Sequence, residues 1–141
     1  MLRWEEVERR LVEARNYWVA TTRADGRPHV MPVWGLWLEG AWLFSTDAAS
    51  VKGRNLARDS RPAVHLESGD DVVVLEGRAQ AVTQRALLTR FAAAYEEKYN
   101  VRPETDNPAA PVFALRPSAA LAWRERGFPS TATCWTFLEN K

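Results

Sequence analysis

Residues 17–46, YWVATTRADGRPHVMPVWGLWLEGAWLFST, predict three β-strands separated by two tight turns. β-Branched and aromatic residues dominate three runs, and Asp25-Gly26 and Glu39-Gly40 separate them as hairpin turns do. Pro32 lacks an amide hydrogen, so we expect the middle strand at a sheet edge or a bulge. The three predicted strands are Tyr17–Arg23, His29–Leu38 and Ala41–Thr46.

Outside this stretch the sequence predicts further strands and three helical segments. Apolar residues recur at helical spacing over Arg3–Arg15 and Gln84–Tyr99, and a loop leads into a shorter helix within Asp47–Asp59. The further strands are Arg61–Ser68, Asp71–Val82, Pro111–Trp123 and Thr131–Leu138. About six strands joined by tight turns indicate a mostly β, antiparallel barrel with short helices, and not a βαβ sheet.

Length and composition restrict the class of protein. A chain of 141 residues predicts one domain, residues 1–141. The 19 basic and 18 acidic residues leave a net charge of +1, so we expect neither nucleic acid nor a membrane as a partner. The first residues are charged throughout and Cys134 is the only cysteine, so we expect a cytoplasmic protein without disulfides.

The sequence lacks the usual catalytic motifs. It has no glycine-rich dinucleotide fingerprint, no phosphate loop of nucleotide hydrolases and no serine elbow. His29 and His65 are the only histidines, and their spacing does not suggest a metal site. Such a chain suits chemistry that is carried by an organic redox cofactor, because the protein then needs only to bind and orient it.

The segment FSTDAASVKGRNL, residues 44–56, has the residues of an anion site. A strand end and a turn with hydroxyl groups precede a predicted helix whose start carries Lys52 and Arg54. Backbone amides and the helix dipole favour an anion there, and Thr46 and Ser50 can donate hydrogen bonds. A solvated basic helix with an ordinary N-cap explains the same residues equally well.

Three segments in order resemble the pyridoxamine 5′-phosphate oxidase-like superfamily, and most of all its small flavin/deazaflavin oxidoreductases: NYWVATTRADGRPHVMPVWGLW, GAWLFSTDAASVKGRNLARDSRPAVHLES and VVVLEGRAQAV. The closing TATCWTF is similar to the last strand of that branch. The resemblance implies a six-stranded Greek-key split β-barrel of the FMN-binding type, and a homodimer with cofactors between its subunits. The implied cofactor contacts are the backbone of Met31, Pro32, Val33 and Trp34, the residues Phe44, Ser45 and Thr46 beside the ring and ribityl chain, Ser50, Lys52 and Arg54 at the phosphate, and Asn55 bracing the loop, with His65 and Glu67 as weaker candidates.

Departures from the family pattern narrow the expected cofactor. Many flavin-binding members have adjacent Arg-Lys at the phosphate, whereas Val51 precedes Lys52 here. Cys134 stands where the branch often has arginine, and we expect its thiol to be packed. The C-terminal signature of true pyridoxamine-phosphate oxidases is missing, which argues against vitamin B6 oxidation. The deazaflavin coenzyme (F-420), with its acidic tail, is favoured over the alternative FMN by a cluster of cations: Lys52, Arg54, Arg58 and Arg61. Pairing of these arginines with Glu or Asp on the surface explains them equally well.

We therefore expect an oxidoreductase that transfers a hydride to a small conjugated, apolar acceptor, without catalytic side chains or a metal. The candidates for the walls of the acceptor site are Trp34, Trp37, Trp42 and Trp123, some of which must lie in the core. Two other functions stay open. One is a cofactor-binding or carrier protein without turnover, and the other is a haem-binding barrel with His29 or His65 as axial ligand.

Overall fold

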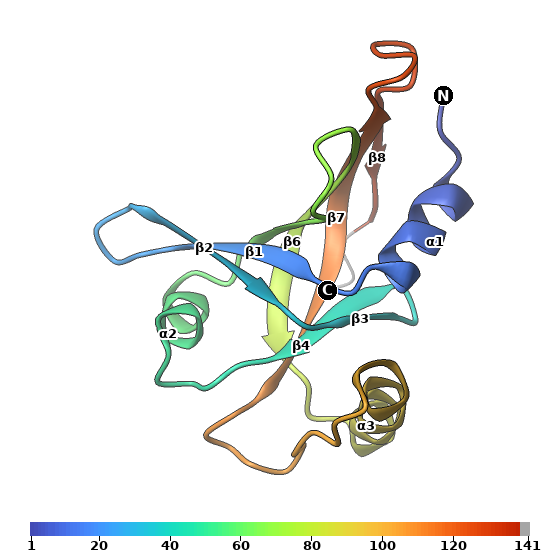
Figure 1. The fold of residues 1–141 in the computed structure, drawn as a ribbon. Coiled ribbons are helices and arrows are strands. Elements are labelled where there is room, and N and C mark those ends of the chain that lie inside the picture. The colour runs from blue at the N-terminus through green and yellow to red at the C-terminus, as the bar shows by residue number, and fades with distance from the viewer. Residues whose placement is uncertain (139–141) are drawn as a thin grey trace.

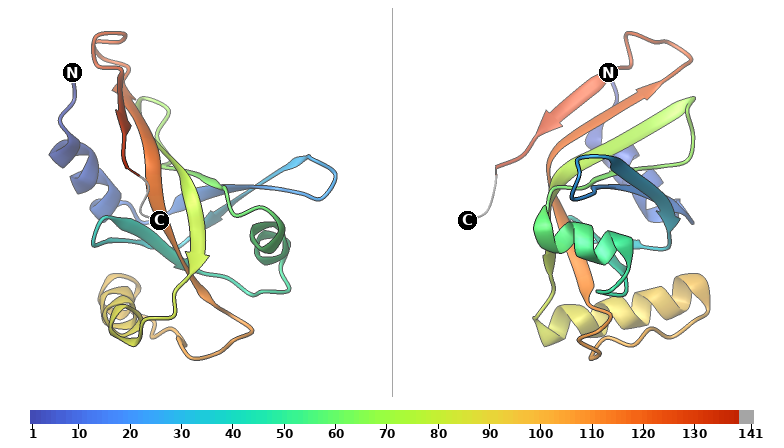
Figure 2. Two further views of the ribbon diagram at one scale, coloured as in Figure 1. Left: turned by 180° about the vertical axis from the view of Figure 1, so that it is seen from behind. Right: turned by 90° about the vertical axis from the view of Figure 1, so that its left-hand side faces the viewer.

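Strands in the order β2-β1-β5-β6-β7-β4-β3, with β8 added on β7, form one antiparallel sheet (Figure 1). The computed structural model describes residues 1–138. The strands are β1 (Tyr17–Thr22), β2 (Pro28–Val33), β3 (Leu36–Leu38), β4 (Ala41–Ser45), β5 (Ala63–His65), β6 (Asp71–Ala81), β7 (Val112–Arg124) and β8 (Thr133–Thr136). The helices are α1 (Trp4–Glu13), α2 (Val51–Arg58) and α3 (Arg85–Tyr99). The sheet curls into half of a barrel, with the three helices on different sides of it (Figure 2).

The predicted mostly β, antiparallel fold is confirmed, but the described residues form eight strands, whereas seven strand segments were predicted for a barrel of about six strands. One reason is that the predicted strand His29–Leu38 breaks into β2 and β3 around Gly35. The Gly35 amide donates to the Tyr99 hydroxyl at 3.0 Å, and the Gly35 carbonyl accepts from that hydroxyl at 2.8 Å. These backbone groups therefore bond a helix side chain and not a neighbouring strand, so the ladder stops there.

The long strands β6 and β7 give the sheet its curvature. They pair along their whole length, with a register shift between Glu76 and Gly77. A Cβ atom at Gly77 would lie 2.3 Å from the Arg116 carbonyl oxygen, so only glycine lets the two backbones approach this closely. Because a bulge bends a strand and increases its twist, the sheet can fold over its own core.

The main core lies between the inner face of the sheet and α1. Val7 and Leu11 of α1 are buried together with Tyr17, Trp42 and Phe44 of the sheet. A smaller cluster packs α3 against β3 and β4, with Phe91 at its centre. The apolar residues whose spacing predicted α1 and α3 thus form the buried face of each helix.

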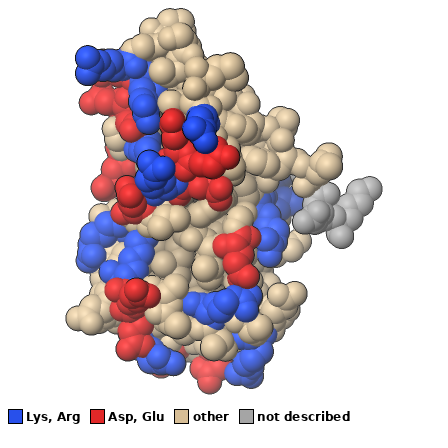
Figure 3. Space-filling view, turned by 90° about the vertical axis from the view of Figure 1, so that its right-hand side faces the viewer, with Lys and Arg blue, Asp and Glu red and all other residues tan. Residues whose placement is uncertain are grey.

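Charged side chains tie α1 to the sheet and are mixed in sign on the surface. The Arg10 guanidinium donates to the Asp71 carboxylate at 2.6 Å, and Arg124 lies 3.6 Å from Glu6. Basic and acidic groups alternate over the face shown in Figure 3. None of the three helices has both the length and the apolar character needed to cross a bilayer.

Lys98 near the end of α3 is half-buried beside the break between β2 and β3. Its ammonium donates to the Tyr17 hydroxyl at 2.9 Å and to the Gly35 carbonyl at 3.1 Å. Burial, and secondly the nearby Arg15, lowers the pKa of Lys98 from 10.5 to about 8. The folded chain therefore releases this proton at a lower pH than the unfolded chain does.

The free energy of unfolding is expected to rise between about pH 8 and about pH 9.5, because in this window the unfolded chain holds a proton at Lys98 that the folded chain has lost. Burial raises the pKa values of Tyr17 and Tyr99, and these groups oppose the trend only above about pH 10. Denaturant titrations at the two pH values should show the rise in the wild type and not in Lys98→Met. An equal rise in both proteins would contradict this assignment.

Candidate cofactor site

The turn between β4 and α2 is held in one conformation by its own hydroxyl groups. Ser50 is the N-cap of α2, and its Oγ accepts from the Gly53 amide at 3.0 Å and donates to the Asp47 carbonyl at 2.6 Å. Thr46 Oγ1 lies 3.2 Å from Ser50 Oγ. The structure thus brings Thr46 and Ser50 together, and the Ser50 hydroxyl proton is used within the turn, where it orders the backbone that leads into the helix.

Gly53 allows this turn to pack directly on the first turn of α2. A Cβ atom at Gly53 would lie 2.3 Å from the Asp47 carbonyl oxygen and 2.8 Å from that of Ala48. Both neighbours are backbone atoms, so the loop would have to move to make room. The position of the turn over the helix start therefore depends on a glycine here.

Asn55 fixes α2 to β1. Its side chain is 4% exposed, and its Nδ2 donates to Thr21 Oγ1 at 3.0 Å. Its Oδ1 accepts from Arg58, whose guanidinium also donates to the Thr22 carbonyl at 2.6 Å. Asn55 thus braces the helix that carries Lys52 and Arg54 against the strand next to β2.

Lys52 and Arg54 lie at the start of α2 without acidic partners. Within residues 1–138, no carboxylate forms an ion pair with either side chain. The first turn of α2 has no acidic residue either. Cations at this end oppose the helix dipole, whereas a bound anion would be stabilised by both the cations and the free amides of Val51 and Lys52.

A hollow of about 290 Å³ lies between α2 and the hairpin that joins β1 to β2. Four arginines and one aspartate, Asp25, line it; the arginines, two from each side, are Arg23, Arg27, Arg54 and Arg58. Arg27 is paired with Asp25 at 2.8 Å, and Arg61, which the sequence placed in the same cluster, is paired with Asp59 at 2.9 Å. Arg23 and Arg27 were not expected at the site. Their positions on either side of the predicted Asp25-Gly26 turn are the sequence feature that could have suggested a cationic hairpin there.

His29 of β2 faces the same cationic surroundings. Its Nδ1 is buried and has no hydrogen-bond partner among the described residues. Burial lowers the pKa of His29, and the positive charges of Arg23 and Lys52 lower it further. The His29 Nδ1 is therefore a buried polar atom without a hydrogen-bond partner among residues 1–138, close to two cations.

β2 presents an open edge and exposed apolar side chains. It pairs with β1 on one side only, so the expectation that Pro32 lies in an edge strand is confirmed. Val30, Met31 and Trp34 are 45%, 43% and 36% exposed. The ring of Trp34 stacks on Tyr99, with centroids 4.5 Å apart.

Three other residues predicted to contact the cofactor differ in their surroundings. Val33 is half-buried in β2, and the single hydroxyl proton of Ser45 is shared between the carbonyl oxygens of Ala110 and Pro111, each 3.3 Å from Oγ. Phe44 is 1% exposed, and its ring stacks on Trp42.

Trp42 and Cys134 differ from their expected positions. Trp42 is fully buried, so it cannot form a wall of an acceptor site. Cys134 was expected to be packed, which is wrong because its side chain is exposed. The alternation of β8 buries Thr133 instead and directs the next residue outward.

A sequence model described as pyridoxamine 5′-phosphate oxidase matches residues 4–124 of the chain. The chain belongs to this family. The family resemblance expected from the sequence is thereby confirmed. No curated protein matches the chain.

Solved structures share the split-barrel fold of this chain. A conserved hypothetical protein, Rv2991 from Mycobacterium tuberculosis, is 26% identical with a TM-score of 0.76, covering 89% of this chain and 87% of that one. A structure described as an F420 reductase is 21% identical, with a TM-score of 0.63 and coverage of 78% and 92%. A haem-binding protein from Mycobacterium smegmatis is 23% identical with a TM-score of 0.71. The match covers 92% of this chain and 56% of that one.

Proposed function

We propose that this family member is an oxidoreductase that binds a deazaflavin coenzyme, or alternatively FMN, and transfers a hydride to a small conjugated acceptor. The start of α2 carries the proposal: it presents Lys52, Arg54 and two free helix amides without any acidic partner among residues 1–138. Such a place suits the phosphate group that both cofactors carry.

The residues present fit such a cofactor. The buried, unpartnered Nδ1 of His29 adds a polar group beside the proposed phosphate position. The open edge of β2 offers backbone groups and the apolar side chain of Met31 to a flat ring. When bound, the cofactor supplies the redox chemistry. The protein would bind the phosphate through Lys52 and Arg54 and would hold the ring along Met31–Trp34.

The arginine-lined hollow supports the deazaflavin coenzyme over FMN. Arg23, Arg54 and Arg58 come from two different elements and line one cavity next to the proposed phosphate position. A flavin phosphate does not need so many guanidinium groups, whereas an acidic tail can engage several of them. The overall net charge of +1 shows that this cluster is a local feature.

We also propose that the working form is a homodimer. Val30, Met31 and Trp34 expose apolar surface around the edge of β2, and one chain covers a ring at that edge from one side only. A second copy would complete the cleft. Sedimentation of the cofactor-loaded protein should give the mass of two chains, and a monomer at saturating cofactor would contradict the proposal.

Turnover separates the enzyme from a carrier protein. Reduced deazaflavin or reduced FMN is mixed with the protein and menadione, and reoxidation is followed by absorbance. An oxidoreductase speeds reoxidation over the rate without protein, and Lys52→Ala raises the KM for the cofactor. Tight binding without acceleration by any quinone or enone acceptor would identify a carrier instead.

Cofactor affinity is expected to rise as the pH falls from about 8 to about 6, because a phosphate beside His29 offsets the charges of Arg23 and Lys52 and so raises the His29 pKa. Binding then takes up a proton. Fluorescence titrations at both pH values should show the effect, and His29→Gln should reduce it. Identical pH dependence in the two proteins would exclude His29 from the site.

A haem-binding function is a second candidate, favoured by His65. Its Nδ1 lies 2.7 Å from the Leu66 carbonyl, a contact that orients the ring as in many metal-binding histidines, and Trp18 stacks on it. A Soret band on addition of haem, lost in His65→Ala and kept in His29→Ala, would support this function. Absence of a Soret band would exclude haem binding.

A further inference from the structure

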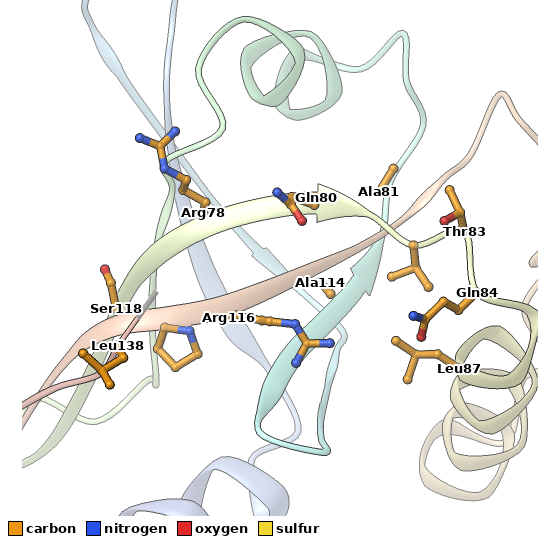
Figure 4. Close-up of a pocket in the computed structure, with 12 residues that line it drawn as sticks. Arg78, Gln80, Ala81, Thr83, Gln84, Leu87, Ala114, Arg116, Ser118 and Leu138 are labelled. Carbon is orange, nitrogen blue, oxygen red and sulfur yellow. The ribbon is translucent and has the colours of Figure 1, made fainter. Parts of the chain in front are cut away.

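A second hollow, of about 330 Å³, lies on the outer face of β6 and β7 and reaches the first turn of α3 (Figure 4). None of the residues of the proposed cofactor site lines it. It combines polar groups from the two strands with side chains of the β6–α3 connection. The polar lining residues that matter here are Arg78, Gln80, Gln84, Arg116 and Ser118.

Two arginines face each other across the strands that form the floor of this hollow. Arg78 and Arg116 are register partners of β6 and β7, a position where like charges repel. Their side chains point apart: Arg116 extends toward Gln84 and Leu87, and Arg78 toward the opposite end (Figure 4). In the part of the chain that the structure describes, neither guanidinium has an ion-pair or hydrogen-bond partner.

The end of the hollow that Arg116 enters is also electropositive and partly apolar. Gln84 is the N-cap residue of α3 but makes no side-chain cap, and the first turn of this helix has no acidic residue. Val82, Leu87 and Ala114 form the adjoining wall, and two of these side chains are buried. An anionic group would therefore meet Arg116 and the helix end, while an apolar group attached to it would contact the wall.

We propose that this hollow binds a small organic carboxylate, with the carboxylate on Arg116 and the apolar part against Val82, Leu87 and Ala114. A guanidinium binds a carboxylate through two parallel hydrogen bonds, which gives direction as well as charge. The volume lies at the lower end of the range for small-molecule sites. This site is separate from the proposed cofactor site, and neither depends on the other.

The test uses hexanoate and its neutral analogue hexanamide as probes of the cofactor-free protein, followed by ¹H–¹⁵N NMR. Hexanoate is expected to shift the amide signals of Gln80, Thr83 and Gln84 and the side-chain signal of Arg116. Hexanamide should bind about tenfold or more weakly, since it lacks the charge. Arg116→Gln should weaken hexanoate binding to a similar extent. Its side chain is exposed, so the variant keeps the fold, which its spectrum verifies.

Two control variants make the result specific. Arg126→Gln removes an exposed arginine on the β7–β8 loop and should leave hexanoate binding unchanged. Lys52→Ala should also leave it unchanged, so failure of the cofactor proposal would not affect this one. Equal binding of hexanamide, or equal hexanoate binding by Arg116→Gln, would overturn the site. So would a change of oligomeric state in Arg116→Gln without any hexanoate binding, because Arg116 would then contact a second copy.

Discussion

Gly53→Ala is expected to destabilise the protein by roughly 1–3 kcal/mol and to weaken cofactor binding at the same time. The added methyl group would lie 2.3 Å from the Asp47 carbonyl oxygen, and no flexible side chain is there to move aside. The loop must shift, which breaks the hydrogen bond from the Gly53 amide to Ser50 Oγ. Because Thr46 and Ser50 belong to this loop, we expect the cofactor Kd to rise about tenfold or more.

Gly69→Ala is the matched control for Gly53→Ala. A Cβ atom at Gly69 meets nothing within 4 Å. The same substitution there should leave stability unchanged or raise it by about 0.4–1 kcal/mol through the unfolded chain, and should not affect cofactor binding. Denaturant unfolding and fluorescence titration of both variants check the prediction. Equal behaviour of the two would show that the loop does not depend on close contact with α2.

Tyr99→Phe is expected to lower the free energy of unfolding by about 1–3 kcal/mol. The Tyr99 hydroxyl accepts from the Gly35 amide at 3.0 Å, and its single proton is shared between the carbonyl oxygens of Arg15 (2.7 Å) and Gly35 (2.8 Å). Without it, the buried amide of Gly35 has no partner at the point where β2 ends. The phenyl ring remains, so stacking on Trp34 is kept and the loss reports on the hydroxyl alone.

Tyr95→Phe provides the control for this substitution. Tyr95 lies on the same helix with its ring centroid 4.9 Å from that of Tyr99, but its hydroxyl has no hydrogen bond to any described residue. Its removal should change stability by less than about 0.5 kcal/mol. Chemical unfolding of the two variants compares them directly. A loss as large in Tyr95→Phe would mean that ring packing, and not the bond to Gly35, decides the effect.

Local patterns predicted most of the fold because they reflect strong local preferences. Apolar spacing predicted α1 and α3 to within about two residues at their ends. The lack of an amide on Pro32 predicted the edge position of β2. The break at Gly35 could not be predicted in this way. It depends on Tyr99, which is 64 residues away in the chain and is brought there only by the packing of α3.

In the candidate site, too, features set by neighbouring residues were predictable and features set by distant contacts were not. The Thr46–Lys52 turn and its cap were predictable because Ser50 and the helix start are neighbours in the sequence. Arg23 and Arg27 were missed, and His29 was considered only as a haem ligand, because the approach of these residues to α2 depends on how the β1–β2 hairpin curls toward that helix. Likewise, the burial of Trp42 and the exposure of Cys134 follow from strand register, which alternation fixes only after the pairing is known.

A fluorescence titration of the cofactor-free protein with the deazaflavin coenzyme and with FMN tests the central claim most directly. Wild type, Lys52→Ala and the charge control Arg126→Ala are compared. We expect the deazaflavin coenzyme to bind more tightly, with a Kd that rises about tenfold in Lys52→Ala and is unchanged in Arg126→Ala. Binding of neither cofactor, or equal affinity in wild type and Lys52→Ala, would contradict a cofactor phosphate site at the start of α2.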